Sequence, residues 1–435
     1  MINYLDNLVF INLLIAAIVF FSLNVKRLKR NIYLGKKIDR TDQPKERLKN
    51  MLLIAFGQSR MVKRPVAGFL HLIVYVGFII INLEVLEIII DGIFGSHRIF
   101  SFLGGFYHVL IGTFEFLALL VLVSVIIFWT RRNIQKIKRF WNPEMKGWPK
   151  KDANMILYIE AFLMLLFLTM NAADFEFQQV GGGNIISRYI APIFSGYSDH
   201  NLHMIERTAW WLHIGGIFYF LNYLYYSKHL HILLAFPNTY FANLNPYGKF
   251  TNLESVTNEV KMMLDPTIDP FAAAPSNDNA TPEKFGASDV FDLNRVQLLN
   301  AYTCTECGRC TSVCPANITG KKLSPRKIMM DTRDRIEKVG RNMDRNTTFV
   351  PDNKTLLNDY ITPEEIWACT SCNACVEACP VNIDPLSIII DLRRYLVMEQ
   401  SAAPSDLNTM MTNIENNGAP WPFNQQDRLN WKDNS

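Results

Sequence analysis

Two runs of cysteines carry the clearest chemical signal in this sequence of 435 residues. Each run has the spacing C-x2-C-x2-C-x3-C-P, the first from Cys304 to Pro315 and the second from Cys369 to Pro380. In this pattern, three thiolates of one run bind a [4Fe-4S] cluster and the fourth reaches across to a second cluster. The spacing therefore predicts two clusters, one on Cys304, Cys307, Cys310 and Cys379 and the other on Cys369, Cys372, Cys375 and Cys314.

Zinc knuckles or disulfides are the alternative uses of these thiols. Zinc sites normally take their four ligands as two separated pairs, whereas each run here holds four cysteines close together. The two runs also use all 8 cysteines of the chain, so none remains for a disulfide elsewhere. We therefore favour clusters, and we expect this part of the chain to lie in a reducing compartment, the cytoplasm.

Four of the 8 histidines fall at matched depths in long apolar segments and form a second candidate site. His71 and His231 lie near one membrane face, and His108 and His213 lie near the other. In a continuous helix, 231 − 213 = 18 residues make five turns, which would put both rings on one face about 27 Å apart. Because haem iron takes imidazole as an axial ligand, the pairs His71 with His231 and His108 with His213 predict two b-type haems.

Plainer interpretations exist for the polar residues in these apolar segments. Each histidine could be a buried imidazole bonded to a carbonyl, or a residue in the headgroup zone. His229 is a weaker ligand candidate, because a spacing of 16 residues turns it nearly opposite to His213. Four glutamates either stabilise the helices as paired carboxylates or serve proton transfer or quinone contact: Glu84, Glu87, Glu115 and Glu160. The sequence assigns none of them a role.

Five apolar stretches are long enough to cross a bilayer as helices, namely 7–25, 66–90, 103–129, 153–173 and 209–236. The first is predicted to be a retained span, because its basic residues follow the apolar run instead of preceding it. Lysines and arginines crowd the segments after the first and third stretches, whereas 91–102 and 174–208 hold only three arginines. By the positive-inside rule, the N-terminus lies outside and the C-terminal half lies in the cytoplasm. This predicts a multi-pass protein of the bacterial inner (cytoplasmic) membrane.

The rest of the chain is polar. Residues 237–295 are rich in Pro, Ala, Asn and Asp, which predicts a linker. Helix caps follow at Ser324-Pro325 and Asp384-Pro385, with a capping box at Thr362 and Glu365. A tail over 401–435, with Trp421 and Trp431, is either a surface segment with packed aromatics or a docking segment for another subunit.

The predicted fold is therefore all-α, since there is little strand signal. A five-helix transmembrane haem-binding bundle over 1–236 is followed by the linker and by an α-helical dicluster ferredoxin domain over 296–400 in the cytoplasm. The net charge of +4 is too small to argue for a nucleic-acid partner.

Two parts of the chain resemble known families. The apolar stretches with His213 in Trp210-Trp-Leu-His213 and His231 in Ser227-Lys-His-Leu-His231 resemble the cytochrome b subunit of respiratory nitrate reductase and its relatives in heterodisulfide reductases. Residues 296–400, with Cys-Pro-x-Asn-Ile after each cysteine run, resemble the dicluster ferredoxin subunit of heterodisulfide reductase and of anaerobic glycerol-3-phosphate dehydrogenase.

The resemblance implies a membrane-anchored electron-transfer subunit of a quinone-linked oxidoreductase, with menaquinone as the membrane substrate. The chain departs from those families in having no adjacent cysteines and no Gly-rich dinucleotide fingerprint. Catalysis would then lie on a separate cytoplasmic subunit, either a Cys-Cys-Gly protein or a flavoprotein. The alternatives are a membrane-tethered ferredoxin and a redox-sensing scaffold, both without haem.

Overall fold

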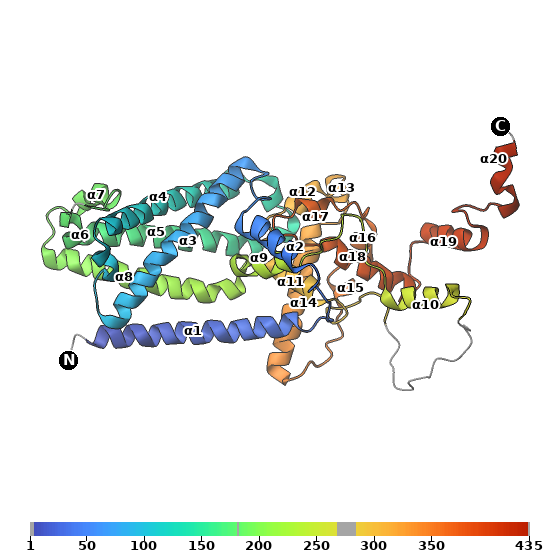
Figure 1. The fold of residues 1–435 in the computed structure, drawn as a ribbon, viewed down its shortest axis with the longest axis horizontal. Helices are drawn as coiled ribbons and strands as arrows, with labels where there is room; N and C mark the ends of the chain where they lie inside the picture. The colour runs from blue at the N-terminus through green and yellow to red at the C-terminus, as the bar shows by residue number, and fades with distance from the viewer. Residues whose placement is uncertain (1–3, 181, 268–283, 434–435) are drawn as a thin grey trace.

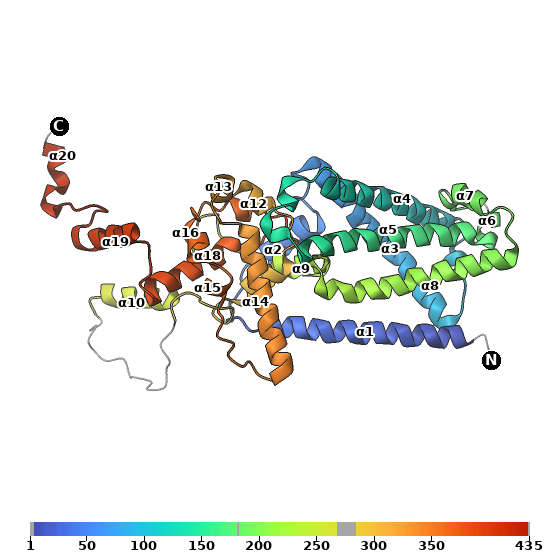
Figure 2. The same ribbon diagram turned by 180° about the vertical axis from the view of Figure 1, so that it is seen from behind.

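Five long helices lie side by side through the first half of the chain (Figure 1). They are α1 (Leu5–Ile32), α3 (Pro65–Phe94), α4 (Gly105–Asn133), α5 (Trp148–Ala173) and α8 (Asp199–Tyr223). The computed structural model describes residues 4–180, 182–267 and 284–433, and these contain no β-strand. The half of the chain with the cysteine runs packs against one end of the bundle, as the reverse view in Figure 2 also shows. We call this end the near end and the opposite one the far end.

Four of these helices, α1, α3, α4 and α5, are long and apolar enough to cross a membrane. The predicted fifth span, 209–236, is not confirmed, because the chain does not form one helix there. Helix α8 ends at Tyr223, two 3-10 turns follow at Leu224–Tyr226 and Lys228–Leu230, and α9 (His231–Tyr240) begins after them. His213 and His231 therefore lie on separate helices, and the predicted shared face of one continuous helix is wrong.

A polar contact with α5 explains the break between α8 and α9. Ser227 has an extended backbone (φ −113°, ψ 148°), and its hydroxyl accepts a hydrogen bond from the His229 amide at 3.0 Å. The buried carboxylate of Asp152 in α5 accepts from the Tyr223 hydroxyl at 2.7 Å and from the Lys228 amide at 3.1 Å. These side chains satisfy polar groups that the break exposes, so the interruption is stable even where it is buried.

Two glycines let α3 approach its neighbours closely. A Cβ at Gly92 would lie 2.6 Å from the Phe10 ring of α1, and one at Gly77 would lie 2.6 Å from a Val121 methyl of α4. Any larger residue would push these helices apart. The close approach supports one continuous apolar core, which includes Phe10 and Phe167.

At the near end, helix α2 (Pro44–Met51) fastens the bundle to the chain after α9. The Arg47 guanidinium is buried and donates to the carbonyls of Tyr240 at 3.2 Å and Ala242 at 2.9 Å. The apolar run 51–56 is too short to cross a bilayer and forms the end of α2 and the π-helical turn Leu52–Phe56. Short 3-10 turns at Lys138–Phe140 and Pro143–Met145 join α4 to α5 on the same side.

The cysteine half consists of short helices around the long α14. These are α11 (Arg295–Thr303), α12 (Arg309–Val313), α13 (Pro315–Ile318), α14 (Pro325–Asn346), α15 (Leu356–Asp359), α16 (Pro363–Trp367), α17 (Ala374–Ala378) and α18 (Pro385–Arg394), with a π-helical turn at Tyr395–Glu399. All the predicted caps are confirmed. Ser324 and Asp384 accept amide hydrogen bonds at the starts of α14 and α18, and Thr362 with Glu365 forms a capping box at α16.

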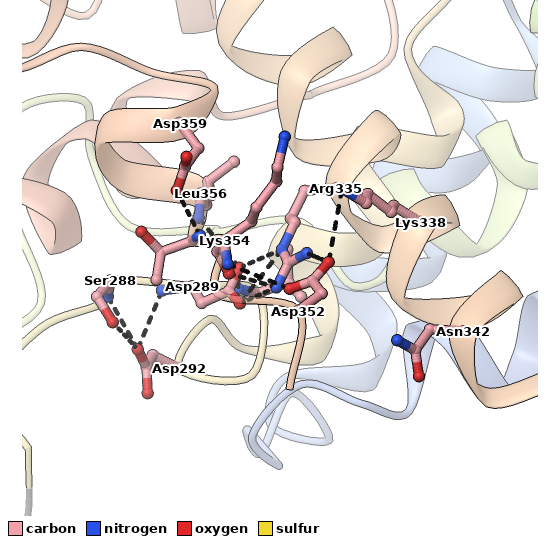
Figure 3. A network of polar contacts seen from close by, with 12 residues as sticks. Ser288, Asp289, Asp292, Arg335, Lys338, Asn342, Asp352, Lys354, Leu356 and Asp359 are labelled. Atoms are coloured by element: carbon pink, nitrogen blue, oxygen red, sulfur yellow. Dashed lines mark hydrogen bonds and ion pairs between the residues drawn. The ribbon is translucent and has the colours of Figure 1, made fainter. Parts of the chain in front are cut away.

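The end of the predicted linker packs into this half. Ala287, Val290 and Leu293 are fully buried in its core. Nearby, the Arg335 guanidinium of α14 lies between Asp289 and Asp352 (Figure 3). It thereby connects the chain before the first cysteine run to the chain that leads into the second. Residues 268–283 of the predicted linker lie outside the described residues.

The far end carries a small cap (Figure 1). The cap consists of α6 (Phe175–Val180), α7 (Ser187–Ile190) and 3-10 turns at Ala191–Phe194 and Ile99–Leu103.

The C-terminal tail lies away from the rest of the cysteine half (Figure 1). Helices α10 (Glu254–Leu264) and α19 (Ser405–Asn417) have no buried residues, and Gln425–Leu429 and α20 (Asn430–Asp433) follow at the end of the tail.

Candidate metal centres

The two cysteine runs adopt the same unusual backbone. In the first run, Glu306 and Gly308 have φ angles of 54° and 70°, and in the second run the matching residues Ser371 and Asn373 have φ angles of 57° and 60°. Residues with a Cβ rarely adopt such left-handed conformations, which cost about 1 kcal/mol each. Their repetition at matching positions means that both runs wrap around a space of the same shape.

The thiols gather into two sets across the runs. A small cavity of about 20 Å³ is lined by Cys304, Cys307, Cys310 and Cys379, together with Cys375. The thiols that act electrostatically on Cys375 are Cys369, Cys314 and Cys372. The cavity thus holds all four thiols of one predicted ligand set with Cys375 of the other beside them, and we call the two predicted sets the first set and the second set. All eight cysteines are free of disulfides, and no three Cys, His, Asp or Glu side chains in the described residues are close enough to hold a single metal ion.

The chemical state of the buried thiols does not suit nucleophilic catalysis. Burial raises the pKa of Cys304 to about 11 and that of Cys379 to about 12. Such thiols are neutral at pH 7 and react slowly, because the thiolate is the nucleophile. Bound iron would replace their protons, since coordination deprotonates a thiol outright. The donor set thus fits iron–sulfur clusters.

His71 of α3 and His231 of α9 face each other at the near end of the bundle. Their ring centroids are 6.4 Å apart, with an angle of 41° between the rings. A bond from a metal to an imidazole nitrogen is about 2 Å long, so two rings on opposite sides of one metal have centroids about 6 Å apart. The separation fits two axial ligands of one haem iron, and we call these residues the near-end pair.

The ring nitrogens of the near-end pair also fit this role. His231 bonds through Nδ1 to the Lys228 carbonyl at 3.1 Å, which leaves its Nε2 for a metal. His71 has a buried Nδ1 without any hydrogen-bond partner. His229, the weaker candidate, lies beside the pair, with its Nε2 3.6 Å from the Glu160 carboxylate.

The structure does not bring His108 and His213 together as a second pair. His108 bonds through Nδ1 to the Gly182 carbonyl at 3.0 Å, and Gly182 sits so close to the ring that a Cβ there would lie 2.6 Å from it. His213 bonds through Nδ1 to the Leu163 carbonyl at 3.0 Å, and its buried Nε2 lies 3.9 Å from the Glu84 carboxylate. Within the described residues, no ring contact joins the two histidines.

The four glutamates of the bundle have different surroundings. Glu115 accepts from the Ile186 and Ser187 amides at 2.8 and 3.0 Å and so holds the far-end cap. Glu87 accepts from the Phe100 amide at 2.9 Å and from the Tyr107 hydroxyl at 3.1 Å. Both carboxylates thus accept hydrogen bonds from backbone amides at the far end of the bundle.

The other two glutamates face histidines. Glu160 faces His229, whereas Glu84 faces His213 with one oxygen unbonded. Glu84 also lines a cavity of about 200 Å³ at the far end, together with Trp210 and Trp211.

Glu306 is a residue near the candidate centres that the sequence did not single out. The Lys228 ammonium bonds to the Glu306 carboxylate, which also accepts from Arg333 at 2.6 Å. Glu306 lies between Cys304 and Cys307, so this contact joins the bundle to the first run. The charge of Glu306 inside a cysteine run could have suggested an ion pair. The partner lies 78 positions away, so no local pattern in the sequence identifies it.

The comparisons with known proteins agree with the iron–sulfur interpretation. Residues 303–383, which contain both runs, match the family model described as the 4Fe-4S dicluster domain. Over 96% of its length, the chain is 31% identical to the probable iron-sulfur-binding oxidoreductase FadF of Bacillus subtilis, of which it covers 59%. Over 98% of its length, it is 27% identical to the EtfAB:quinone oxidoreductase of Syntrophomonas wolfei, of which it also covers 59%.

A further match covers less of the chain. Over 27% of its length, the chain is 29% identical to one subunit of the Ferredoxin/F(420)H(2)-dependent CoB-CoM heterodisulfide reductase of Methanosarcina acetivorans, and it covers 60% of that subunit. The chain thus spans about three fifths of the length of these relatives. No solved structure matches it.

These similarities support iron–sulfur clusters and a general role in electron transfer. They confirm a resemblance of the chain to heterodisulfide reductase subunits. The resemblance of the helices to the nitrate reductase cytochrome b, the haems and the individual ligand assignments remain predictions.

Proposed function

We propose that this chain carries electrons between a soluble electron-transfer protein and a membrane quinone. Two [4Fe-4S] clusters on the first and second sets and a b-type haem on the near-end pair would be the carriers. Clusters and haem each accept and release single electrons, and the protein holds, orients and shields them. The observation that carries this proposal is the position of the near-end pair. The two imidazoles of this pair, one on α3 and one on α9, face each other at 6.4 Å. Helix α9 lies at the end of the bundle against which the cysteine half packs (Figure 1).

The names of similar proteins indicate what lies at the two ends of this route. One similar protein is named for EtfAB and a quinone, which favours a flavoprotein as the soluble partner and a quinone as the membrane substrate. Menaquinone follows only from the family resemblance. A Cys-Cys-Gly protein is the alternative partner, because one similar protein belongs to a heterodisulfide reductase. We propose the orientation that loop charge predicts, with the cysteine half in the cytoplasm.

The route as proposed contains one haem. A second haem on His108 and His213 lacks geometric support, because no ring contact among the described residues brings these two imidazoles together and the His213 Nε2 faces Glu84. Without any haem, the chain would be a membrane-tethered ferredoxin, the second candidate function.

Reduced-minus-oxidised absorption spectra of the purified full chain test this proposal. We expect b-type bands in the wild type, their loss in His71→Ala and His231→Ala, and cluster signals that remain in both variants. His200→Ala is the matched control, because His200 is an exposed histidine in the first turn of α8. In His213→Ala, the b-type bands should be unchanged if the chain holds one haem and halved if it holds two. Cluster signals without b-type bands in the wild type would refute the haem and favour the tethered ferredoxin.

A further inference from the structure

Lys228 contacts the near-end pair and the first cysteine run at once. Its carbonyl receives the hydrogen bond of His231, at 3.1 Å. Its ammonium, with a side chain only 9% exposed, bonds to Glu306 and donates to the Pro149 carbonyl at 2.7 Å. One residue at the break between α8 and α9 therefore connects an imidazole in the bundle to the loop between Cys304 and Cys307.

The Glu306 carboxylate is a fixed point of this junction. Its side chain is 2% exposed and is held by two cations, Lys228 from the bundle side and Arg333 from α14. A buried charge group persists only if all its members are paired, and removing one partner leaves an uncompensated charge. The triad therefore fixes how the first run sits against the bundle.

Further hydrogen bonds connect the first set to the near end of the bundle. Arg309, between Cys307 and Cys310, donates to the carbonyls of Arg60 at 3.0 Å and Met61 at 3.1 Å, just before α3. Arg60 in turn donates to the carbonyl of Cys379 at 3.3 Å. The backbone at Cys379, which carries the fourth thiol of the first set, is thus held to the near end of the bundle as well.

The second set has different surroundings. Cys372 is exposed, and so is its neighbour Thr370. The contacts that hold this loop come from within the cysteine half: Arg393 of α18 donates to the Ile366 carbonyl at 2.7 Å, to the Cys369 carbonyl and to the Ser371 hydroxyl at 3.2 Å. The two runs share one sequence pattern but face opposite environments.

We propose that the carriers are ordered, an inference that rests on the proposed function. The first set holds the cluster next to the near-end pair, and Lys228 is the positioning residue of that junction. The second set holds the cluster that exchanges electrons with the soluble partner, at the surface around Cys372. Each transfer moves one electron from a reduced carrier to an oxidised one, without breaking a bond. The soluble partner and the quinone are the donor and acceptor at the two ends.

Electron paramagnetic resonance of the full chain with reduced clusters tests this order by two independent perturbations. A soluble dysprosium chelate speeds the relaxation of paramagnets near the surface, so it should affect the signal of the second-set cluster. Lys228→Met removes a buried positive charge next to the first set. It should lower the reduction potential of the first-set cluster, because the reduced cluster is the more negative state. Glu306→Gln removes a negative charge and should shift that same cluster in the opposite direction.

The matched controls are Lys322→Met and Glu364→Gln, which disrupt an exposed ion pair. These should leave the potential of the chelate-insensitive cluster unchanged, because exposed pairs are screened by water. Lys228→Arg keeps the charge and should restore most of the wild-type potential. If Lys228→Met does not fold, Glu306→Gln alone decides the outcome by the sign of its shift.

The order is supported if the signal that Lys228→Met lowers and Glu306→Gln raises is the one that the chelate leaves unaffected. It is overturned if the chelate-sensitive signal carries these shifts, or if neither signal shifts. Wild-type protein without two cluster signals, or without b-type bands, would instead refute the proposed function, and the order with it.

Discussion

Replacing Arg335 by leucine should loosen the part of the chain that carries the second cysteine run. The Arg335 side chain is 1% exposed and donates to Asp289 at 2.7 and 2.9 Å, to Asp352 at 2.7 Å and to the Lys354 carbonyl at 2.6 Å (Figure 3). Asp289 also accepts from the Leu356 amide at 3.1 Å. The guanidinium therefore ties the segment before the first run to the one before the second.

The size of the effect follows from what the substitution leaves behind. Asp289 would keep a largely buried carboxylate, 12% exposed, without its cation. Breaking a buried ion pair from one side typically costs about 3–5 kcal/mol. At 1.36 kcal/mol for each factor of ten, the opening equilibrium of this region should rise by about two to four orders of magnitude.

Hydrogen–deuterium exchange of the full chain measures this opening directly. Protection of the Leu356 amide should fall by that factor in Arg335→Leu, whereas Arg341→Leu, at an exposed position of the same helix, should change it little. Arg335→Lys should lie between them, because it keeps the charge but loses the planar fork. A loss below about tenfold in Arg335→Leu, or an equal loss in the Arg341 control, would refute the reasoning, because both outcomes fall short of the cost of an unpaired buried charge.

Three other predictions concern the cysteine half. Gly308→Ala should weaken cluster retention, measured as iron per chain, because the φ angle of Gly308 is +70° and a Cβ there would lie 2.5 Å from a guanidinium nitrogen. Asn373→Gly, at the matching position of the second run, should leave the iron content unchanged. Burial raises the pKa of Asp331 to about 6, so the folded state binds a proton that the unfolded chain releases near pH 4. The free energy of unfolding should therefore fall by about 3 kcal/mol, relative to that of Asp331→Asn, as the pH rises from about 4 to 6. Melting temperatures measured across this range would show the loss. After iron removal, alkylation at pH 7.5 followed by mass spectrometry should label the exposed Cys372 well before Cys304, whose pKa burial raises to about 11.

Local patterns in the sequence predicted much of this structure. Four of the five predicted spans lie within helices α1, α3, α4 and α5 or differ from their ends by two residues at most, because a long apolar run has few other stable forms in a membrane. The caps at Ser324, Thr362 and Asp384 were predicted for the same reason: a cap depends on residues within one turn. The two cysteine runs likewise owe their shape to spacing within twelve residues.

Features that depend on distant residues were not predictable in this way. The break at Ser227 needs Asp152, which lies 75 positions earlier in the chain (227 − 152 = 75) and supplies the missing hydrogen bonds. Helix periodicity alone therefore placed His213 and His231 on one face, wrongly. Matched depth suggested the near-end pair, and the structure brings its two rings together, yet the same argument failed to bring His108 and His213 together. Depth fixes the position of a residue along a helix but not the direction of its side chain.

The two cysteine runs also illustrate how one motif can give two different carriers. The reduction potential of a cluster depends on nearby charge, hydrogen bonds to its sulfurs and exposure to solvent. Three guanidinium groups interact electrostatically with thiols of the first set: Arg139, Arg309 and Arg333. Glu306 opposes them there, whereas Cys369 and Cys375 of the second set interact with one cation, Arg393, and one anion, Asp384. The excess of positive charge stabilises the more negative, reduced state of the first cluster, so its potential should be the higher.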